Sequence, residues 1–332
     1  MHIVVCGNYG ANNLGDELIL AGILRQIREI SPKAEITVLS ANPTQTAQKY
    51  QVTSLPHFPA GLRSLFRKAK TDLKDTDFFI LGGGGLFASL TFRANIIWAI
   101  QAFHALRRKI PLIIYGQSLE NLRNPLTKLI VKAIFRRAKL IAMRDQKSRD
   151  LLAEIGIRKT HLIPDPALHP TPPSSLVSSS LSILALRGNC KMANHPDFAN
   201  HIKQAIKKLQ NPHFIAFQPN EDLPLQKKIA QLPAANYEDL PKAKIIIAMR
   251  LHSIISAINY GTPFLALAYS PKVTNFLKNA DLENLITKPK DIADRLENFN
   301  HEAAKQQIAA YQKRLAPEIA EAKEFLRKTF NL

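Results

Sequence analysis

The segment that decides the fold runs from Ile245 to Val273 and reads IIIAMRLHSIISAINYGTPFLALAYSPKV. It begins with a β-branched run, continues as an apolar helical segment that stops at Gly261, and resumes as a second apolar run from Phe264 to Tyr269. This alternation predicts a strand, a helix and a second strand. Because such crossovers are right-handed and leave their strands parallel, the residues that follow the two strands are expected at the same edge of one sheet.

Three cationic or titratable side chains follow those strands: Arg250, His252 and Lys272. Neighbouring strands lie about 4.8 Å apart, so the three groups are expected around one crevice at the carboxyl edge, where open α/β sheets bind ligands. His252 is the candidate acid or base, because the ordinary pKa of histidine lies near neutrality. A structural histidine at a strand–helix junction is the alternative, and the company of Arg250 and Lys272 favours the functional interpretation.

The rest of the chain repeats this alternation of short apolar runs and amphipathic segments, which is typical of a doubly wound α/β sheet. Further strands are expected at residues 2–6, 35–39, 78–81, 112–115, 140–143, 181–186 and 214–217. Helices are expected at residues 17–30, 94–108, 126–138, 146–155 and 196–209, with Asp16 as the N-cap of the first. A final amphipathic helix at residues 302–330 is expected to break near Pro317.

A chain of 332 residues exceeds what one hydrophobic core usually fills, so two domains are predicted. Residues 164–180 are rich in proline and serine, which suits neither a helix nor a central strand. The boundary is placed there, which gives two Rossmann-like domains, 1–170 and 171–332, facing a cleft. The C-terminal helix is a candidate to pack back on the first domain.

The composition combines an ordinary apolar content with a large positive charge. The chain has 45 Lys and Arg against 26 Asp and Glu, a formal net charge of +19, which favours phosphorylated ligands, a membrane surface or nucleic acid as partners. The only cysteines, Cys6 and Cys190, exclude a disulfide framework and indicate a reducing compartment. Without a recognisable signal peptide or an apolar run of membrane-spanning length, a cytoplasmic location is expected, with peripheral contact to the inner face of the membrane as an open alternative.

One basic amphipathic segment, residues 61–74, is the candidate for that membrane contact. Its cations are Arg63, Arg67, Lys68, Lys70 and Lys74. They can hold a protein near anionic lipid. A solvated helix face is an equally weighted alternative, since charge runs are often no more than that.

Two glycine-rich loops and a set of arginines complete the candidate features. The loop GNYGANNLGDE, residues 7–17, follows the first strand, and a run of four glycines follows the strand at 78–81; neither is a Walker loop or a GxGxxG motif. Arg144, Arg187 and Arg250 each follow an apolar run, where arginine can bind a carboxylate or phosphate. A salt bridge to a nearby Asp or Glu is the competing explanation for each. No metal-ligand motif occurs, so neither a metal nor a cofactor is expected.

Taken together, these motifs resemble the polysaccharide pyruvyl transferase family, closest to its bacterial cell-wall branch. The resemblance rests on Asn13-x-Gly15-Asp16-Glu17, the glycine run at Gly82, Arg144-Asp145 with Ser148, Asp165-Pro166-Ala167, Phe217-Gln218-Pro219 with Asp222, Met249-Arg250-Leu251-His252-Ser253 and Pro271-Lys272-Val273. These motifs occur in the same order over about Ile3 to Leu277. The Arg-x-His-Ser and Pro-Lys-Val pair is the most specific of them.

The resemblance implies a fold similar to GT-B glycosyltransferases and transfer of the pyruvyl group of phosphoenolpyruvate, as a ketal, to a sugar of a cell-surface or lipid-linked glycan, with release of phosphate. It implies catalytic roles for Arg250, His252 and Lys272. It further implies donor binding by Arg144, Arg187, Arg250 and Ser253, and acceptor binding by Asn13, Asp16 and Gln218. Phosphoenolpyruvate carries a carboxylate and a phosphate, which two or three cations in one crevice suit independently of the resemblance.

Two segments depart from the family pattern, and two rival functions stay open. Ser270 stands where the family often has Asp, and Gly116–Asn121 replaces a segment that resembles GQGIGP. A GT-B nucleotide-sugar glycosyltransferase shares the architecture, but no acidic ribose-binding residue is evident here. A basic nucleic-acid-binding protein explains the charge but not the cluster of Arg250, His252 and Lys272, so nucleic acid is not expected as a partner.

Overall fold

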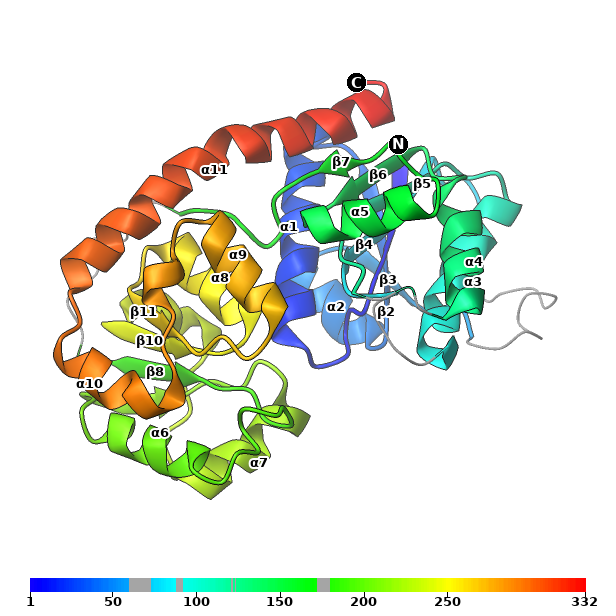
Figure 1. Ribbon diagram of the computed structural model, residues 1–332. Coiled ribbons are helices and arrows are strands. Elements are labelled where there is room, and N and C mark those ends of the chain that lie inside the picture. The colour runs from blue at the N-terminus through cyan, green and yellow to red at the C-terminus, as the bar shows by residue number, and fades with distance from the viewer. Residues whose placement is uncertain (60–72, 88–91, 121, 123, 172–179) are drawn as a thin grey trace. The chain divides into compact units, whose positions relative to one another are not determined.

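The computed structural model describes residues 1–59, 73–87, 92–120, 122, 124–171 and 180–332. The chain divides into two compact units, which we call unit 1 (Met1–Ala167 and Pro317–Leu332) and unit 2 (Leu168–Ala316). Each unit has its own parallel sheet with helices packed against it (Figure 1). The predicted α/β class with doubly wound parallel sheets is confirmed.

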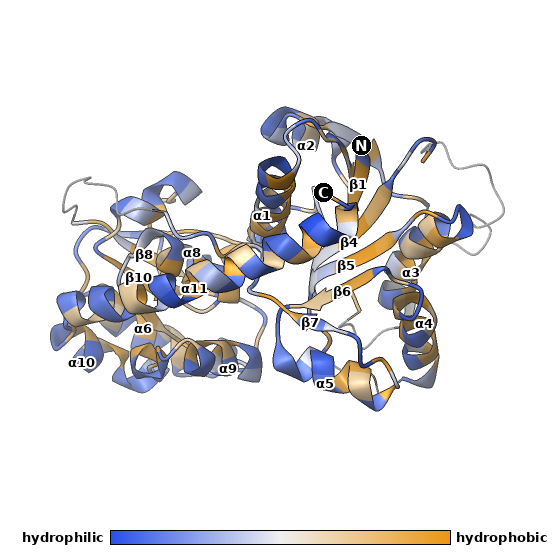
Figure 2. Ribbon diagram, turned by 90° about the horizontal axis from the view of Figure 1, so that it is seen from above, coloured by the Kyte–Doolittle hydropathy of each residue, from blue (hydrophilic) through white to orange (hydrophobic). Residues whose placement is uncertain are grey.

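Unit 1 is built on a seven-stranded parallel sheet with the order β3-β2-β1-β4-β5-β6-β7. Its strands are β1 (His2–Cys6), β2 (Glu35–Ser40), β3 (Thr53–Pro56), β4 (Phe78–Gly84), β5 (Leu112–Gln117), β6 (Leu140–Met143) and β7 (His161–Leu162). Its helices are α1 (Leu14–Ile30), α2 (Pro43–Tyr50), α3 (Phe92–Arg107), α4 (Pro125–Phe135) and α5 (Gln146–Glu154). Helix α1 lies on one side of the strands, and α3 and α4 lie on the other (Figure 2).

The central strands of unit 1 are buried on both faces, which is why they are continuous apolar runs in the sequence. Val4 of β1 pairs with Thr37 of β2 and with Phe79 of β4. It belongs to the core cluster that also contains Ala99 of α3 and Val131 of α4. Both faces of the sheet are therefore closed by helices, and only its edges are available for a ligand.

Unit 2 has a four-stranded parallel sheet with the order β11-β10-β8-β9. Its strands are β8 (Ser182–Ala185), β9 (Pro212–Phe214), β10 (Ile245–Ala248) and β11 (Phe264–Ala266). Its helices are α6 (Phe198–Ile206), α7 (Pro219–Ile229), α8 (Leu251–Tyr260), α9 (Pro271–Asn279) and α10 (Ile292–Glu297), with short 3₁₀ segments η2 (Tyr237–Lys242), η3 (Glu283–Leu285) and η4 (Pro289–Asp291).

The predicted strand–helix–strand unit is present as β10, α8 and β11. Ile246 of β10 pairs in parallel with Phe264 of β11, and the three strand positions Ile245, Ile246 and Ile247 are at most 3% exposed. Gly261 ends α8 in the left-handed conformation, with φ of 67°, which glycine adopts without steric cost. The side chains that follow β10 and β11 therefore share one edge, as the opening segment predicts.

Helix α11 (His301–Phe330) is continuous, so the predicted break near Pro317 is wrong. Ile308, Leu315 and Leu326 on its inward side are 1% exposed or less. Their burial stabilises the helix and outweighs the backbone hydrogen bond that a proline removes.

The division between the two units falls within α11. Residues up to Ala316 group with unit 2, and residues from Pro317 group with unit 1. Inside unit 1, Lys323 forms an ion pair with Glu29 at 2.9 Å. The C-terminal part of this helix is thus an integral element of unit 1, whereas its first part belongs to unit 2.

The start of α1 differs from the prediction. The helix begins at Leu14, and Asn13, not Asp16, is its N-cap, because the Asn13 side chain accepts a hydrogen bond from the Gly15 backbone N–H at 3.0 Å. Asp16 lies in the first turn, where a carboxylate is favoured by the helix dipole.

Strand β4 also exceeds its predicted end, because it continues through the glycine run to Gly84. A Cβ at Gly82 would approach the Tyr9 hydroxyl to 2.6 Å, and a Cβ at Gly83 would approach Ile19 to 2.0 Å. These glycines are therefore required by close packing against the first loop and α1.

Some elements of the structure were not predicted, and one predicted segment lies mostly outside the described residues. The short elements α2, β3 and β7 were not expected, and β9 ends at Phe214 rather than at residue 217. Of the basic segment 61–74, Arg63, Arg67, Lys68 and Lys70 lie outside the described residues. Among the helices that the structure describes, none has the length and apolar character needed to span a lipid bilayer.

Candidate functional site

The carboxyl edge of the unit 2 sheet carries most of the predicted site residues. Each strand is followed by at least one polar side chain. These are Arg187 after β8, Gln218 after β9, Arg250 and His252 after β10, and Tyr269 and Lys272 after β11. Because the four strands are parallel and adjacent, these side chains converge on one edge.

Arg250 directs most of its donors to carboxylates of helix α7. Its Nε lies 3.1 and 2.9 Å from the two carboxylate oxygens of Asp222, and its Nη2 donates to Asp222 at 2.6 Å and to Glu221 at 2.8 Å. Its Nη1 donates to the Gln218 side-chain oxygen at 3.2 Å. The side chain is 11% exposed. The ion-pair explanation therefore applies to Arg250, and these bonds fix the orientation of its guanidinium group.

Asp222 is fully buried and connects three strand ends. Besides Arg250, its carboxylate accepts the backbone N–H groups of Gly188 at 3.3 Å and Gln218 at 2.9 Å. Burial acts to lower the pKa of Arg250, but the bonds to Asp222 and Glu221 outweigh that effect and raise the pKa above its ordinary value. The arginine is consequently a permanent cation held rigidly at this edge.

Arg187 is the more open of the two arginines, with 30% of its side chain exposed. Its Nη1 donates to the Tyr269 hydroxyl at 2.6 Å, and its guanidinium carbon lies 5.0 Å from the centre of the Tyr269 ring. The buried Nε of Arg187 has no hydrogen-bond partner within the part of the chain that the structure describes. Because this Nε is buried, only the exposed part of the guanidinium group is open to a ligand.

Glu221 places one carboxylate between the two arginines. Its Oε2 lies 2.8 Å from Nη2 of Arg250 and 3.5 Å from Nη2 of Arg187. Two guanidinium groups around one carboxylate form a site for an anion, and here the chain supplies that anion itself. The sequence analysis missed Glu221 and Tyr269. For Glu221 the available signal was the pair of acidic residues two and three positions after Pro219, in the first turn of a helix.

His252 and Lys272 occupy equivalent positions, each being the second residue of a helix that starts at this edge. Both are half-buried. The Ser253 hydroxyl donates to the Arg250 carbonyl at 2.6 Å and is fully buried, so it stabilises the first turn of α8. A donor-binding role for Ser253 would require that bond to open.

Gln218 lies in unit 2, beside the donor-side candidate Arg250. Its side chain contacts Arg250, and it precedes the first residue of α7. Asn13 and Asp16, the other predicted acceptor residues, belong to unit 1. Acceptor binding by Gln218 stays a prediction.

Asn13 and Asp16 lie in the loop that follows β1 in unit 1. The Asp16 carboxylate accepts a hydrogen bond from the Asn8 side-chain amide at 2.8 Å. A Cβ at Gly84, where φ is +87°, would lie 3.0 Å from the other Asp16 oxygen. The loop and the glycine-rich end of β4 therefore form one polar surface at the carboxyl edge of the unit 1 sheet.

His57, which the sequence analysis missed, lies at the same edge of unit 1. Its Nε2 is 2.9 Å from the Gly7 carbonyl oxygen. Because a carbonyl only accepts, Nε2 carries the hydrogen and Nδ1 carries the lone pair. Burial lowers the pKa of His57, so the ring is neutral near pH 7. Only its position after β3, an element that the sequence analysis did not predict, links it to the site.

Arg144 belongs to unit 1 and forms a buried ion pair there. Its Nη1 donates to Asp165 and its Nε donates to the Ser118 hydroxyl at 2.6 Å, with 3% of the side chain exposed. Donor binding by Arg144 would require this pair to open. Its geometry is that of a residue that fixes the loops after β5 and β7.

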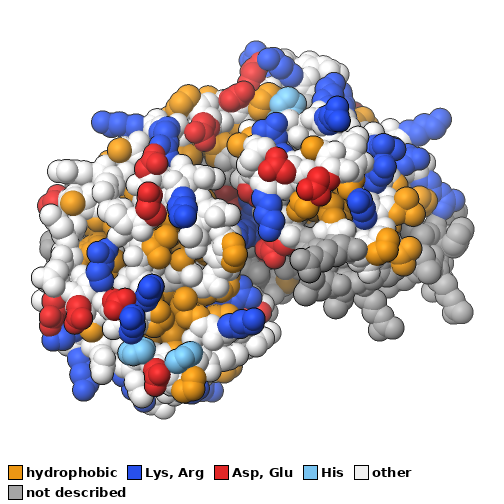
Figure 3. Space-filling view, in the orientation of Figure 1, with side chains coloured by type: hydrophobic (Ala, Val, Ile, Leu, Met, Phe, Trp, Pro, Cys, Tyr) orange, Lys and Arg blue, Asp and Glu red, His pale blue; other side chains and the backbone are white. Residues whose placement is uncertain are grey.

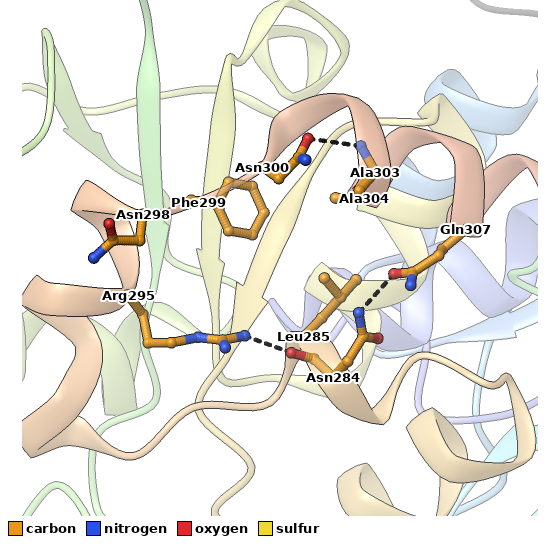
Figure 4. Close-up of a pocket in the computed structure, with 9 residues that line it drawn as sticks. All are labelled: Asn284, Leu285, Arg295, Asn298, Phe299, Asn300, Ala303, Ala304 and Gln307. Atoms are coloured by element: carbon orange, nitrogen blue, oxygen red, sulfur yellow. Dashed lines mark hydrogen bonds between the residues drawn. The ribbon is translucent and has the colours of Figure 1, made fainter.

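A cavity of about 190 Å³ in unit 2 lies between η3, α10 and the start of α11 (Figure 4). It is lined by Asn284, Leu285, Arg295, Asn298, Phe299, Asn300, Ala303, Ala304 and Gln307. Its polar groups bind one another: the Asn284 amide donates to Gln307 at 2.8 Å, and Arg295 donates to the Asn284 carbonyl. None of the predicted site residues lines it. Over the described ranges, no group of three or more His, Cys, Asp or Glu is arranged to hold a metal ion.

Comparisons with known proteins agree with the motifs and with the fold. The family model for polysaccharide pyruvyl transferase matches residues 13–271, which include Asn13, Arg250 and His252 and end one residue before Lys272. No curated protein sequence matches the chain.

Solved structures with the same fold include a UDP-GlcNAc 2-epimerase from Neisseria meningitidis bound to UDP-GlcNAc, at 13% identity, 99% coverage of both chains and a TM-score of 0.59. A glycosyltransferase from Rickettsia africae is 11% identical over 98% of both chains, with a TM-score of 0.61. The S. aureus MnaA–UDP structure is 10% identical over 95% of this chain and 94% of that chain, with a TM-score of 0.62. At these identities the likeness concerns the fold, and the predicted GT-B-like architecture is confirmed.

Proposed function

The chain belongs to the polysaccharide pyruvyl transferase family, and we propose that it transfers the pyruvyl group of phosphoenolpyruvate to a sugar of a cell-surface or lipid-linked polysaccharide precursor as a ketal, releasing phosphate. The observation that carries the proposal is the pair Arg187 and Arg250, which flank one carboxylate position at the edge where His252 and Lys272 begin their helices. Phosphoenolpyruvate supplies the two anionic groups that such an edge suits.

The two arginines are assigned to the donor carboxylate. Arg187 contributes the exposed part of its guanidinium group, and Arg250 contributes a guanidinium orientation fixed by Asp222. The donor carboxylate takes the place of the Glu221 carboxylate, which has the same charge and geometry. Lys272 and the N-terminus of α8 are assigned to the phosphate, because backbone N–H groups and the helix dipole favour an anion there.

His252 is assigned the proton transfer. In its protonated form it gives a proton to the methylene carbon, the π electrons of the C=C bond form the new C–H bond, and the adjacent carbon becomes electrophilic. A sugar hydroxyl attacks that carbon and forms the first C–O bond. Loss of phosphate then regenerates the electrophile, and a second hydroxyl of the same sugar closes the ketal.

The protons balance without any further reactant. The hydroxyl that attacks first loses a proton that restores the protonated state of His252, and the proton of the second hydroxyl leaves with the phosphate. Two hydroxyl hydrogens are thus consumed, one in the new methyl group and one on the released phosphate. Neither a metal ion nor a redox cofactor takes part in the proposed steps.

The acceptor is assigned to unit 1, through Asn13 and Asp16. A carboxylate and an amide can bind sugar hydroxyls by accepting and donating hydrogen bonds. Ser270 and the segment Gly116–Asn121 are assigned to the choice of the acceptor sugar, because there this chain departs from the family pattern.

The test is phosphate release from phosphoenolpyruvate in the presence of a panel of nitrophenyl and lipid-linked sugars, with nucleotide sugars as the control donors. Phosphate release that depends on one sugar, with a pyruvyl mass added to that sugar, is the expected result. Release of a nucleoside diphosphate from a nucleotide sugar, with phosphoenolpyruvate inert, would replace the proposal by a glycosyltransferase.

The variant His252→Ala is expected to lower turnover on the order of 10²-fold or more, because general acid catalysis contributes at least that much. His195→Ala is the matched control, since the His195 side chain is 65% exposed and has no role in the proposed site. Unchanged turnover in a folded His252→Ala protein would remove the acid role from this residue.

A further inference from the structure

Among the helices that the structure describes, α4 carries the two large apolar side chains with the highest exposed fractions. Leu129 is 63% exposed and Leu126 is 56% exposed. Phe103, on the adjacent helix α3, is 44% exposed. The two helices are in contact, and the Asn95 side chain of α3 donates to the Thr127 hydroxyl of α4 at 3.2 Å. Both helices of this pair therefore expose large apolar side chains.

The exposed residues of α4 form an ordered pattern. Leu126, Leu129 and Ala133, which are exposed, recur at intervals of three and four residues. They share one stripe of the helix with Ile130, which is partly buried against the core. The opposite stripe is buried in the core, and includes Val131. Helix α4 is therefore apolar on its inner face and on part of its outer face, which folding of this unit alone does not explain.

A row of cations runs beside the apolar stripe. Lys128, Lys132 and Arg136 are spaced four residues apart, and none of them forms an ion pair with any residue that the structure describes. Neither α3 nor α4 contains an acidic residue. From Phe78 to Met143 the sequence has ten Lys or Arg and a single acid, Glu120. Basic and apolar side chains gather on this flank of unit 1 (Figure 3).

We infer that this surface, defined by the apolar stripe and the cationic row of α4, docks on an anionic lipid bilayer. At the surface of a bilayer, exposed leucines can insert at the boundary between headgroups and acyl chains, and neighbouring lysines can bind the lipid phosphates. None of the residues that define this surface belongs to the basic segment 61–74, and the inference is independent of the proposed reaction.

Two other occupants fit the same observations less well. A nucleic acid would neutralise the cations but leave Leu126 and Leu129 in water, because phosphate contacts use no apolar surface. A second copy of the chain would place this face against itself in a two-fold dimer. The cationic row would then meet its own copy with no acid on either helix to compensate.

The test is co-sedimentation of the full chain with vesicles at physiological salt, without phosphoenolpyruvate or acceptor. Vesicles of phosphatidylcholine alone are compared with vesicles that also contain phosphatidylglycerol. Binding is expected only with the anionic lipid. Leu126→Gln/Leu129→Gln is expected to weaken it on the order of tenfold, and Lys128→Gln/Lys132→Gln about fivefold per lysine.

Leu162→Gln is the matched control, since Leu162 is a 45% exposed leucine of the same unit outside this surface, and it should bind like the unaltered chain. If the leucine variant fails to fold, as judged by circular dichroism, the lysine variant decides. Absence of binding to anionic vesicles, or equal binding by all variants, overturns the inference. So does a dimer in sedimentation velocity that only the leucine variant abolishes.

Discussion

Glu221 places its carboxylate between Arg187 and Arg250, 3.5 and 2.8 Å from their nearest nitrogens. In the proposed reaction the donor carboxylate takes this position, so Glu221 competes with the substrate. Glu221→Gln removes the charge and keeps the size of the side chain. Because one like charge near a surface site is worth about 1 kcal/mol, phosphoenolpyruvate should bind about fivefold more tightly to this variant in isothermal titration calorimetry.

The control for that measurement is Glu238→Gln, which removes an exposed acid of η2 and changes the net charge equally. Its affinity for phosphoenolpyruvate should match that of the unaltered chain. Weaker binding by Glu221→Gln would contradict the competition and would show that Glu221 instead positions the arginines for the donor.

At the residue scale the sequence predicted which side chains follow the strands but not what they contact. Arg144 and Arg250 each follow the letters IAM, so no local pattern separates them. The Arg144 side chain is 3% exposed and is paired with Asp165, whereas Arg250 is paired with Asp222 of α7. The partner of a buried arginine is chosen by tertiary packing, which brings together residues that are 21 and 28 positions apart. This is why the ion pairs could be stated only as alternatives.

At the element scale, the site depends on how closely the segment after β8 approaches helix α7. A Cβ at Gly188 would lie 1.8 Å from the Glu221 backbone oxygen, and the Gly188 N–H binds Asp222. Gly188→Ala must therefore displace the first turn of α7. We expect a loss of about 1–3 kcal/mol in the free energy of unfolding, typical of overpacking, together with weaker binding of phosphoenolpyruvate.

Gly261→Ala is the comparison for that prediction, measured by urea unfolding and by the same calorimetric titration. Gly261 has φ of 67° but no neighbour closer than 4.0 Å to an added Cβ. Alanine there should cost about 1–2 kcal/mol through the backbone alone and leave donor binding intact. Equal donor binding by the Gly188 and Gly261 variants would show that the position of α7 does not control the site.

Elements with a strong local pattern were predicted well, and elements decided by packing were not. The unit formed by β10, α8 and β11 has an apolar period and a glycine stop, and both are readable along the chain. In contrast, Pro317 predicts the end of a helix and the glycines of β4 predict the end of a strand, although both elements continue. Burial of Leu315 and Leu326 overrides the first, and close contact with Tyr9 and Ile19 explains the second. Neither neighbour can be identified before the chain is folded.

At the scale of the whole molecule, four histidines that are buried or partly buried make the stability depend on pH. Burial is the main cause that lowers the pKa of His57, His104, His161 and His301 below the ordinary value of 6.5. Nearby arginines lower it further at His104 and His161. The folded chain therefore keeps these rings neutral at pH values where the unfolded chain has already bound protons.

The sign of the effect follows from proton linkage. Above about pH 6.5 the rings are neutral in both states, so the stability is fully present; as the pH falls below 6.5 the unfolded state binds more protons and the stability is lost. The loss cannot exceed about 1.4 kcal/mol per pH unit for each histidine. The midpoint of urea unfolding should therefore fall between pH 7 and pH 5. Asp239 does not contribute in that window, because its pKa lies below the ordinary carboxylate value of 3.8.

His57→Asn and His104→Asn separate the histidines from other groups. Asparagine cannot bind the proton, so the midpoint of urea unfolding should fall less steeply between pH 7 and pH 5 in each variant. His195→Asn, at an exposed position, should leave that pH dependence unchanged. A midpoint that rises on acidification would contradict the linkage. A slope that persists in the double variant would assign it to other groups. Because both histidines lie in unit 1, a local probe such as Trp98 fluorescence should report the same change.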